Sequence, residues 1–219
     1  MVRTNGNRPA FLIVGDDTRF SLANTQFTDA TSSEATVSFI ATSTTSSRIT
    51  NPRIIFYNTW FYDIGQRSEL PIPNGAVLRL IYSITNSFND PEDNLVLNSY
   101  YSLYRNNFNS ESSGGAITVL QLRNGGGNNL ATQPVIGIYR SQFINNTADP
   151  RPNFALGGGA LAVDASNVRD RVRPNVDISK TLFRDNSVSI GGGGASFKVR
   201  VCVIMRVSML LPVLNLLSC

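Results

Sequence analysis

Apolar and polar residues alternate over short stretches of this chain, and the same arrangement recurs along it. The two clearest copies run from Val135 to Val163 and from Val176 to Val199. Each copy consists of a short alternating strand, a polar corner, a Phe-x-x-Asn sequence and a glycine run that opens a further strand. Because a repeat of this length sets the architecture before any local prediction, the chain is interpreted first as a solenoid.

Five phenylalanines define the register of the repeats. Apolar residues stand five and seven positions before each phenylalanine. Side chains alternate along a strand with period two, so these two apolar positions share one face of a strand. An unbroken strand would turn the Phe to the opposite face. The polar residues in between favour turns and predict a corner that returns the Phe to the interior. These anchors are Phe27, Phe61, Phe108, Phe143 and Phe183.

Asparagines and glycines supply the other structural anchors. Glycine is expected where the backbone needs a positive φ or passes close to another chain segment. The runs at Gly114, Gly157 and Gly194 each precede a new alternating stretch. The predicted anchors of this kind are Asn146, Asn186, Gly115, Gly158 and Gly193.

The spacing of the anchors predicts the number of coils. Intervals range from 34 residues, between Phe27 and Phe61, to 47 residues, between Phe61 and Phe108. A coil of three short strands and their turns needs roughly 20 residues, so each repeat is expected to make two coils. Five degenerate repeats then predict an all-β solenoid of about ten coils.

The repeats resemble a known family. Phe143–Asn146 and Phe183–Asn186, with Gly-Gly-Ala-Ile at Gly114–Ile117 and Gly-Gly-Ala-Leu at Gly158–Leu161, are similar to the polymorphic outer-membrane protein repeat. This resemblance implies a right-handed parallel β-helix of the pectin-lyase-like superfamily. It also implies an extracellular or cell-surface location and adhesion to a carbohydrate or a cell-surface protein. The expected function is therefore a non-catalytic structural or adhesive module, a fragment of a larger protein.

Three regions are expected. Residues 1–19 form a lead-in or incomplete first coil without a signal peptide, and residues 20–199 form the repeat domain. Residues 200–219 lack the glycines and the alternation, and their apolar run is too short for a membrane span. This tail is interpreted either as a gene-model artefact outside the solenoid or as a cap on its open end. Membrane attachment would require other parts of a parent protein.

Composition narrows the functional classes. The chain has a net charge of +4 and no histidine. The excess positive charge is too small and too scattered to indicate binding of nucleic acid. Histidine, the commonest general base and metal ligand, does not occur in the sequence. No cofactor and no metal site are predicted. Asn145-Asn146-Thr147 is a sequon for glycosylation at Asn145.

A polysaccharide lyase or glycoside hydrolase of the pectin-lyase-like class is the alternative function. Hydrolysis would need carboxylates a few ångströms apart. Asp29 and Asp63 recur at one repeat position, and Asp185 is their only later match. A lyase could use Arg105 or Arg140 as its base.

The outward positions before the corner predict a binding face. Stacked coils would align three tyrosines, with three cations in a neighbouring row and about 10 Å between neighbours in each row. Tyr provides an apolar face and a hydroxyl, and Arg suits carboxylate or sulfate. The face would then bind acidic glycans. The alternative is an ordinary exposed strand face, where Tyr is a good β-former. The candidate ligand-binding residues are Tyr57, Tyr104, Arg105, Tyr139, Arg140 and Lys180.

Overall fold

The fold is a right-handed parallel β-helix, as predicted. The described residues of the computed structural model are 5–6, 9–14, 18–32, 35–43, 53–66, 76–84, 94–110, 114–121, 133–149, 158–164, 175–189, 194–198 and 204–208. They contain strands and turns and no helix, so no helix among them could cross a membrane. Every strand pairing is parallel and joins one coil to the next.

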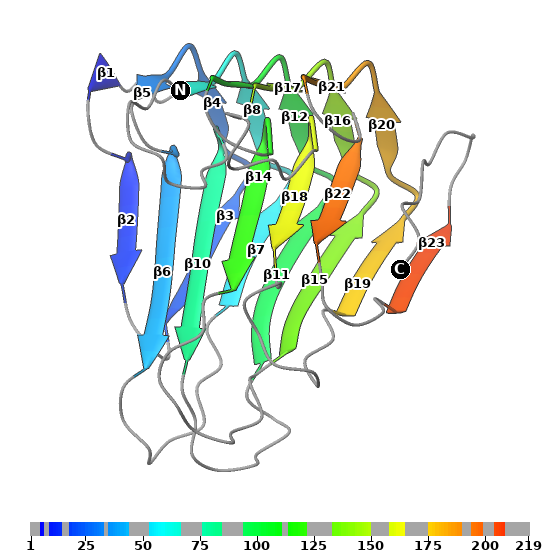
Figure 1. Ribbon diagram of the computed structural model, residues 1–219. Helices are drawn as coiled ribbons and strands as arrows, with labels where there is room; N and C mark the ends of the chain where they lie inside the picture. The colour runs from blue at the N-terminus through cyan, green and yellow to red at the C-terminus, as the bar shows by residue number, and fades with distance from the viewer. Residues whose placement is uncertain are drawn as a thin grey trace.

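Two long sheets form the walls of the solenoid, and we name them sheets C and D. In Figure 1 the strands of sheet C descend in front and those of sheet D ascend behind, while successive coils advance from left to right. Sheet C contains β2 (Phe11–Val14), β6 (Val37–Ser43), β10 (Leu78–Ile84), β14 (Ile117–Gln121), β18 (Leu161–Asp164) and β22 (Ala195–Lys198). Sheet D contains β3 (Arg19–Ala23), β7 (Arg53–Tyr57), β11 (Asn94–Tyr100), β15 (Gln133–Tyr139), β19 (Asn175–Ser179) and β23 (Ile204–Ser208).

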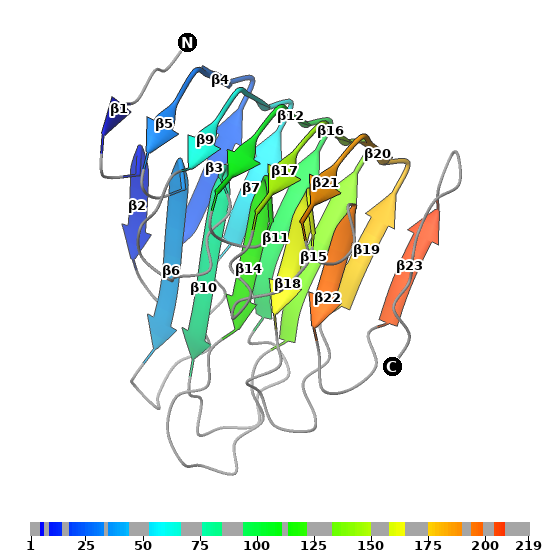
Figure 2. The ribbon, with the colours of Figure 1, turned by 45° about the horizontal axis from the view of Figure 1, so that its top comes forward.

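Two narrow sheets, A and B, close the top of the solenoid, as Figure 2 shows. The chain runs through sheets C, D, A and B in that order before it starts the next coil. Sheet A contains β4 (Gln26–Thr28), β8 (Trp60–Tyr62), β12 (Leu103–Arg105), β16 (Gln142–Ile144) and β20 (Leu182–Arg184). Sheet B contains β1 (Asn5–Gly6), β5 (Thr31–Ser32), β9 (Gly65–Gln66), β13 (Phe108–Asn109), β17 (Thr147–Ala148) and β21 (Ser187–Val188).

Each repeat makes one coil, so the prediction of about ten coils was wrong. Phe20 in β3 pairs directly with Ile54 in β7, and Ile54 pairs with Leu97 in β11, with no strand in between. The estimate of roughly 20 residues per coil left out the fourth strand and the connection from sheet C to sheet D. That connection takes the chain from Ile84 to Asn94 in the third coil.

Stacked aromatic rings fill the interior beneath sheet A. Phe27 stacks on Phe61 at 5.2 Å between ring centroids, and Phe143 stacks on Phe183 at 4.9 Å. The third member of the column is Tyr104, which stacks on Phe61 at 5.4 Å and on Phe143 at 4.4 Å. The prediction of Phe108 was therefore wrong. Phe108 is exposed and pairs with Gly65 and Thr147 in sheet B.

The predicted corner is confirmed before Phe27, Phe61, Phe143 and Phe183, and in the third coil it precedes Tyr104 instead; a second corner follows each anchor. The residue three positions before each anchor has a positive φ between 47° and 52°, and the residue two positions after it has a positive φ between 52° and 55°. One left-handed residue at each place breaks the alternation, so the anchor faces inward. The first row is Asn24, Asn58, Tyr101, Arg140 and Lys180, and the second is Asp29, Asp63, Asn106, Asn145 and Asp185.

The two ends of the solenoid differ. At the N-terminal end, within residues 1–19, the ring of Phe11 meets Phe27 nearly edge-on, with an interplanar angle of 84°, and so ends the stacked column. At the other end, β23 pairs with β19 and continues sheet D. Residues 204–208 thus form the last strand of sheet D, and both interpretations of the tail stay predictions.

Glycine is required at the entry to sheet C. Gly158 has a φ of +132°, and a Cβ on Gly115 would lie only 2.0 Å from the carbonyl oxygen of Gly159. The third predicted glycine anchor, Gly193, lies outside the described residues.

Gly115→Ala is expected to lower the free energy of unfolding by about 1–3 kcal/mol, as overpacking does, because the clashing atoms belong to the backbone. Denaturant titration followed by circular dichroism measures the loss. Gly65→Ala is the matched control, since its added Cβ would find its nearest neighbour at 3.7 Å. Equal losses in the two variants would contradict the close approach at Gly115.

Candidate ligand-binding surface

A row of three tyrosines crosses the outer face of sheet D just before the corner. Tyr57, Tyr100 and Tyr139 are partners in register on three successive strands. Neighbouring members are thus one strand spacing apart, about 4.8 Å, rather than the predicted 10 Å. Tyr57 is 47% exposed, and the other two are half-buried.

The rings of Tyr100 and Tyr139 turn their faces toward each other. Their centroids are 5.1 Å apart and their planes differ by 18°. Gly137 makes room for this arrangement, because a Cβ there would lie 2.5 Å from the ring of Tyr139. The Tyr139 hydroxyl donates a hydrogen bond to Asp177 at 3.2 Å. Desolvation and the neighbouring Asp177 carboxylate raise the pKa of Tyr139, so this hydroxyl stays a neutral donor.

A fourth tyrosine, Tyr101, orients the first cation. The Arg140 Nη1 atom donates a hydrogen bond to the Tyr101 hydroxyl at 3.0 Å, and its guanidinium carbon lies 5.5 Å from the centre of the Tyr101 ring. Tyr101 in turn packs edge-on against Tyr57, with 5.7 Å between centroids. The guanidinium is therefore oriented before any ligand arrives, which reduces the entropy that binding would cost.

A second cation is the next member of the same corner row. The Arg140 backbone N–H donates to the carbonyl oxygen of Ser179, which places Lys180 on the following coil. Both side chains are exposed. Within the described part of the chain, neither forms an ion pair. We call this surface the tyrosine–cation corner, which consists of Tyr57, Tyr100, Tyr101, Tyr139, Arg140 and Lys180.

Two of the six predicted ligand-binding residues lie elsewhere. Tyr104 is completely buried, and burial raises the pKa of its hydroxyl. Arg105 is exposed on the outer face of sheet A, where it pairs with Tyr62 and Ile144. The structure brings together Tyr57, Tyr139, Arg140 and Lys180, and it adds Tyr100 and Tyr101. Tyr100 and Tyr101 stand four and three residues before Tyr104. Both therefore join the surface once Tyr104, and not Phe108, is the third anchor.

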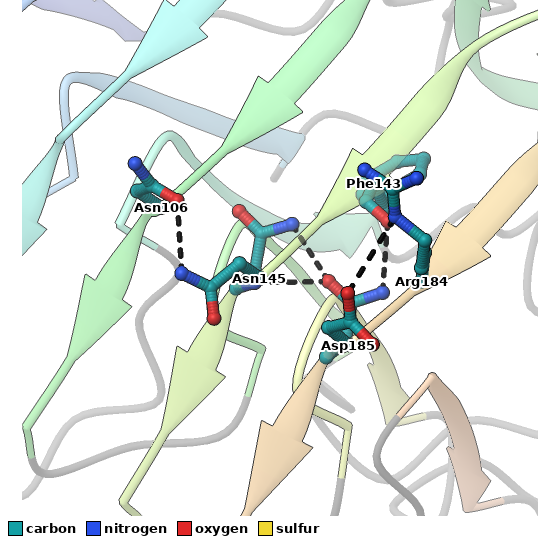
Figure 3. Close-up of polar contacts among 7 residues, drawn as sticks. Asn106, Phe143, Asn145, Arg184 and Asp185 are labelled. Atoms are coloured by element: carbon teal, nitrogen blue, oxygen red, sulfur yellow. Dashed lines mark hydrogen bonds and ion pairs between the residues drawn. The ribbon is translucent and has the colours of Figure 1, made fainter.

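The second corner row places Asx side chains on the other side of sheet A. Figure 3 shows three of its members, Asn106, Asn145 and Asp185. Asn145 Nδ2 donates to Asn106 Oδ1 at 2.9 Å, and Asn106 Nδ2 donates to Asp63 Oδ1 at 3.0 Å. The sequon residue Asn145 is thus exposed, but its amide nitrogen already has an acceptor. Arg184 Nε lies 3.5 Å from Asp185 Oδ2, and both groups are well exposed.

The carboxylates considered for an enzyme stand in this row. Asp29 and Asp63 occupy neighbouring coils, about one strand spacing apart. Asn106 and Asn145 separate them from Asp185. In the described residues, no three His, Cys, Asp or Glu side chains are grouped so as to hold a metal ion.

The fold and this surface define a β-helical repeat protein with an exposed aromatic and basic corner. Comparisons of the chain with protein-family models, with curated proteins and with solved structures found no match. The resemblance to the polymorphic outer-membrane protein repeat therefore stays a prediction.

Proposed function

We propose that this chain is a non-catalytic β-helix module that binds acidic glycans at the tyrosine–cation corner. In this proposal it acts in adhesion at a cell surface or in the extracellular space. The observation that carries it is the Arg140 guanidinium held over Tyr101 beside Lys180, with no carboxylate of the described residues paired to either cation. A sulfate or uronic-acid carboxylate between these two coils would accept hydrogen bonds from both.

The tyrosines support a hydroxyl-rich ligand. Because Tyr100 and Tyr139 stack on each other, they offer ring edges and hydroxyls to a ligand rather than free faces. Tyr57 remains the most exposed ring of the row. This arrangement suits hydrogen bonds to sugar hydroxyls better than the stacking of flat bases, which needs open aromatic faces.

Replacing both corner cations, Arg140→Ala with Lys180→Ala, is expected to weaken glycan binding. Each exposed charge contact contributes about 0.2–1 kcal/mol. The variant also loses the guanidinium that Tyr101 holds in a fixed orientation. The dissociation constant for heparin or polygalacturonate should therefore rise roughly fivefold to thirtyfold. Isothermal titration calorimetry at 0.05 M and 0.15 M salt would measure it, with binding by the parent protein weaker at the higher salt.

The matched control removes the same charge from sheet A. Arg105→Ala with Arg184→Ala deletes two exposed cations outside the tyrosine–cation corner. This control should bind like the parent. If both double variants lose affinity equally, the binding reflects net charge alone and the proposed site is wrong.

A further inference from the structure

A second pair of like charges lies on the outer face of sheet D. Arg19 in β3 and Arg53 in β7 are direct register partners, and both are exposed. Neither forms an ion pair with a described residue. Like charges directly opposite each other in a sheet are destabilising. The same unfavourable arrangement recurs at Arg140 and Lys180, so the two cation pairs call for a common explanation.

The two pairs stand at opposite ends of one surface. Outward positions on β7 are Arg53, Ile55 and Tyr57, so the arginine pair lies at the start of the strands and the tyrosine row at their end. Four residues of strand span about 13 Å, and the pairs are two to four strands apart. The diagonal between them is therefore roughly 16–23 Å.

The surface between the pairs carries little charge. Val96 and Val135 continue the row of Arg53, and Ile55, Asn98 and Gly137 lie in the next row. Asp177 belongs to that second row, but it accepts the hydrogen bond of the Tyr139 hydroxyl. A ligand that bridges the pairs thus meets mostly apolar and neutral polar groups along its middle, with the Asp177 carboxylate as the exception, and cations at both ends.

We propose that the ligand is a linear acidic polysaccharide that lies diagonally across sheet D and contacts both cation pairs at once. This inference rests on the proposed function and extends it to Arg19 and Arg53. One pyranose unit is about as long as one strand spacing, about 4.8 Å, so the bridge needs about four sugar units. Shorter chains reach one pair only, and longer chains gain from the linked second contact.

Chain length is the variable that tests this inference. The probes are heparin-derived oligosaccharides of two and of eight sugar units, titrated into the full chain at 0.15 M salt. For the parent, the eight-unit probe should bind at least tenfold more tightly than the two-unit probe. Arg19→Ala with Arg53→Ala should remove most of that advantage and leave the two-unit affinity within twofold. Arg140→Ala with Lys180→Ala should weaken both probes.

The outcomes separate the two proposals. If the Arg19 and Arg53 variant keeps the full length advantage while the corner variant loses affinity, the diagonal path is wrong and the proposed function stands. If neither variant changes binding of either probe, both proposals fail. Tighter binding of a single-stranded oligonucleotide of equal charge, or of vesicles with anionic lipid, with the same response to both variants would overturn the choice of a glycan.

Discussion

Phe143→Ala is expected to lower the free energy of unfolding by about 3–5 kcal/mol. The side chain is completely buried, and its ring stacks on Tyr104 at 4.4 Å and on Phe183 at 4.9 Å. Removing it loses the apolar burial of the ring and leaves a cavity between two rigid neighbours, which strand pairing on both sides keeps from closing. Two aromatic contacts are lost in addition, each of about 0.5–1.5 kcal/mol.

Phe108→Ala is the matched control for this prediction. Phe108 lies on the outside of sheet B and is 37% exposed, so its truncation should cost less than about 1 kcal/mol. Urea or guanidinium titration, followed by far-ultraviolet circular dichroism, measures both variants. A loss at Phe108 as large as that at Phe143 would show that the aromatic column does not pass through Tyr104.

The sequence allowed the fold to be predicted because most coils repeat the same inward residues. Phe56, Ile138 and Ile178 are buried at the position five residues before their anchors, and Ile117 and Leu161 begin strands of sheet C directly after the glycine runs, as predicted. One-residue slips would have turned these side chains outward. The period-two pattern therefore fixed the register wherever a coil kept its apolar residues.

In the third coil, two polar residues replace the apolar residues that mark the register in the other coils. Tyr104 replaces the anchor Phe, and Ser99 replaces the apolar residue five positions earlier. The two hydroxyls hydrogen-bond at 2.9 Å inside the core, and Ser99 also lies 3.3 Å from the hydroxyl of Ser141. Each polar group is buried, and each needs the other. The apolar spacing therefore does not reveal Ser99 and Tyr104. It predicts Phe108 as the anchor instead, because an apolar residue, Leu103, stands five positions before Phe108.

Sheet C shows what alternation alone could not predict. Ser38, Thr118 and Ala162 point away from the core, yet all three are buried. Arg79 and Asp164 on the same outer face are also nearly buried. The outer face of sheet D is more exposed, at Arg19, Arg53 and Tyr57. Both walls mix polar, small and large apolar residues at their outward positions, such as Ile81 in sheet C and Ile55 in sheet D, so the pattern did not distinguish a covered face from an open one.

Asn146→Ala is expected to lower the free energy of unfolding by about 2–4 kcal/mol. The side-chain oxygen of Asn146 accepts a hydrogen bond from the backbone N–H of Asn107 at 3.2 Å, and its nitrogen donates to the carbonyl oxygen of Tyr104 at 3.0 Å. The left-handed corner residue Asn106 separates these two backbone groups. Both lose their described partner in the variant, and each orphaned buried group costs about 1–3 kcal/mol.

The loss should extend to neighbouring coils, because Asn146 is the middle of a ladder. Asn107 Nδ2 donates to Asn146 Oδ1, and Asn146 Nδ2 donates to Asn186 Oδ1, both at 2.8 Å. Hydrogen exchange measured by NMR should therefore show faster exchange at the amides of Ile64 and Asn107 in the variant, since Asn107 holds the Ile64 N–H. The control is Asn145→Gly, which removes an exposed side chain while keeping the positive φ available. It should change stability by no more than about 1 kcal/mol. An Asn146→Ala variant as stable as this control, with unchanged exchange at Asn107, would show that the buried ladder contributes nothing to holding the coils together.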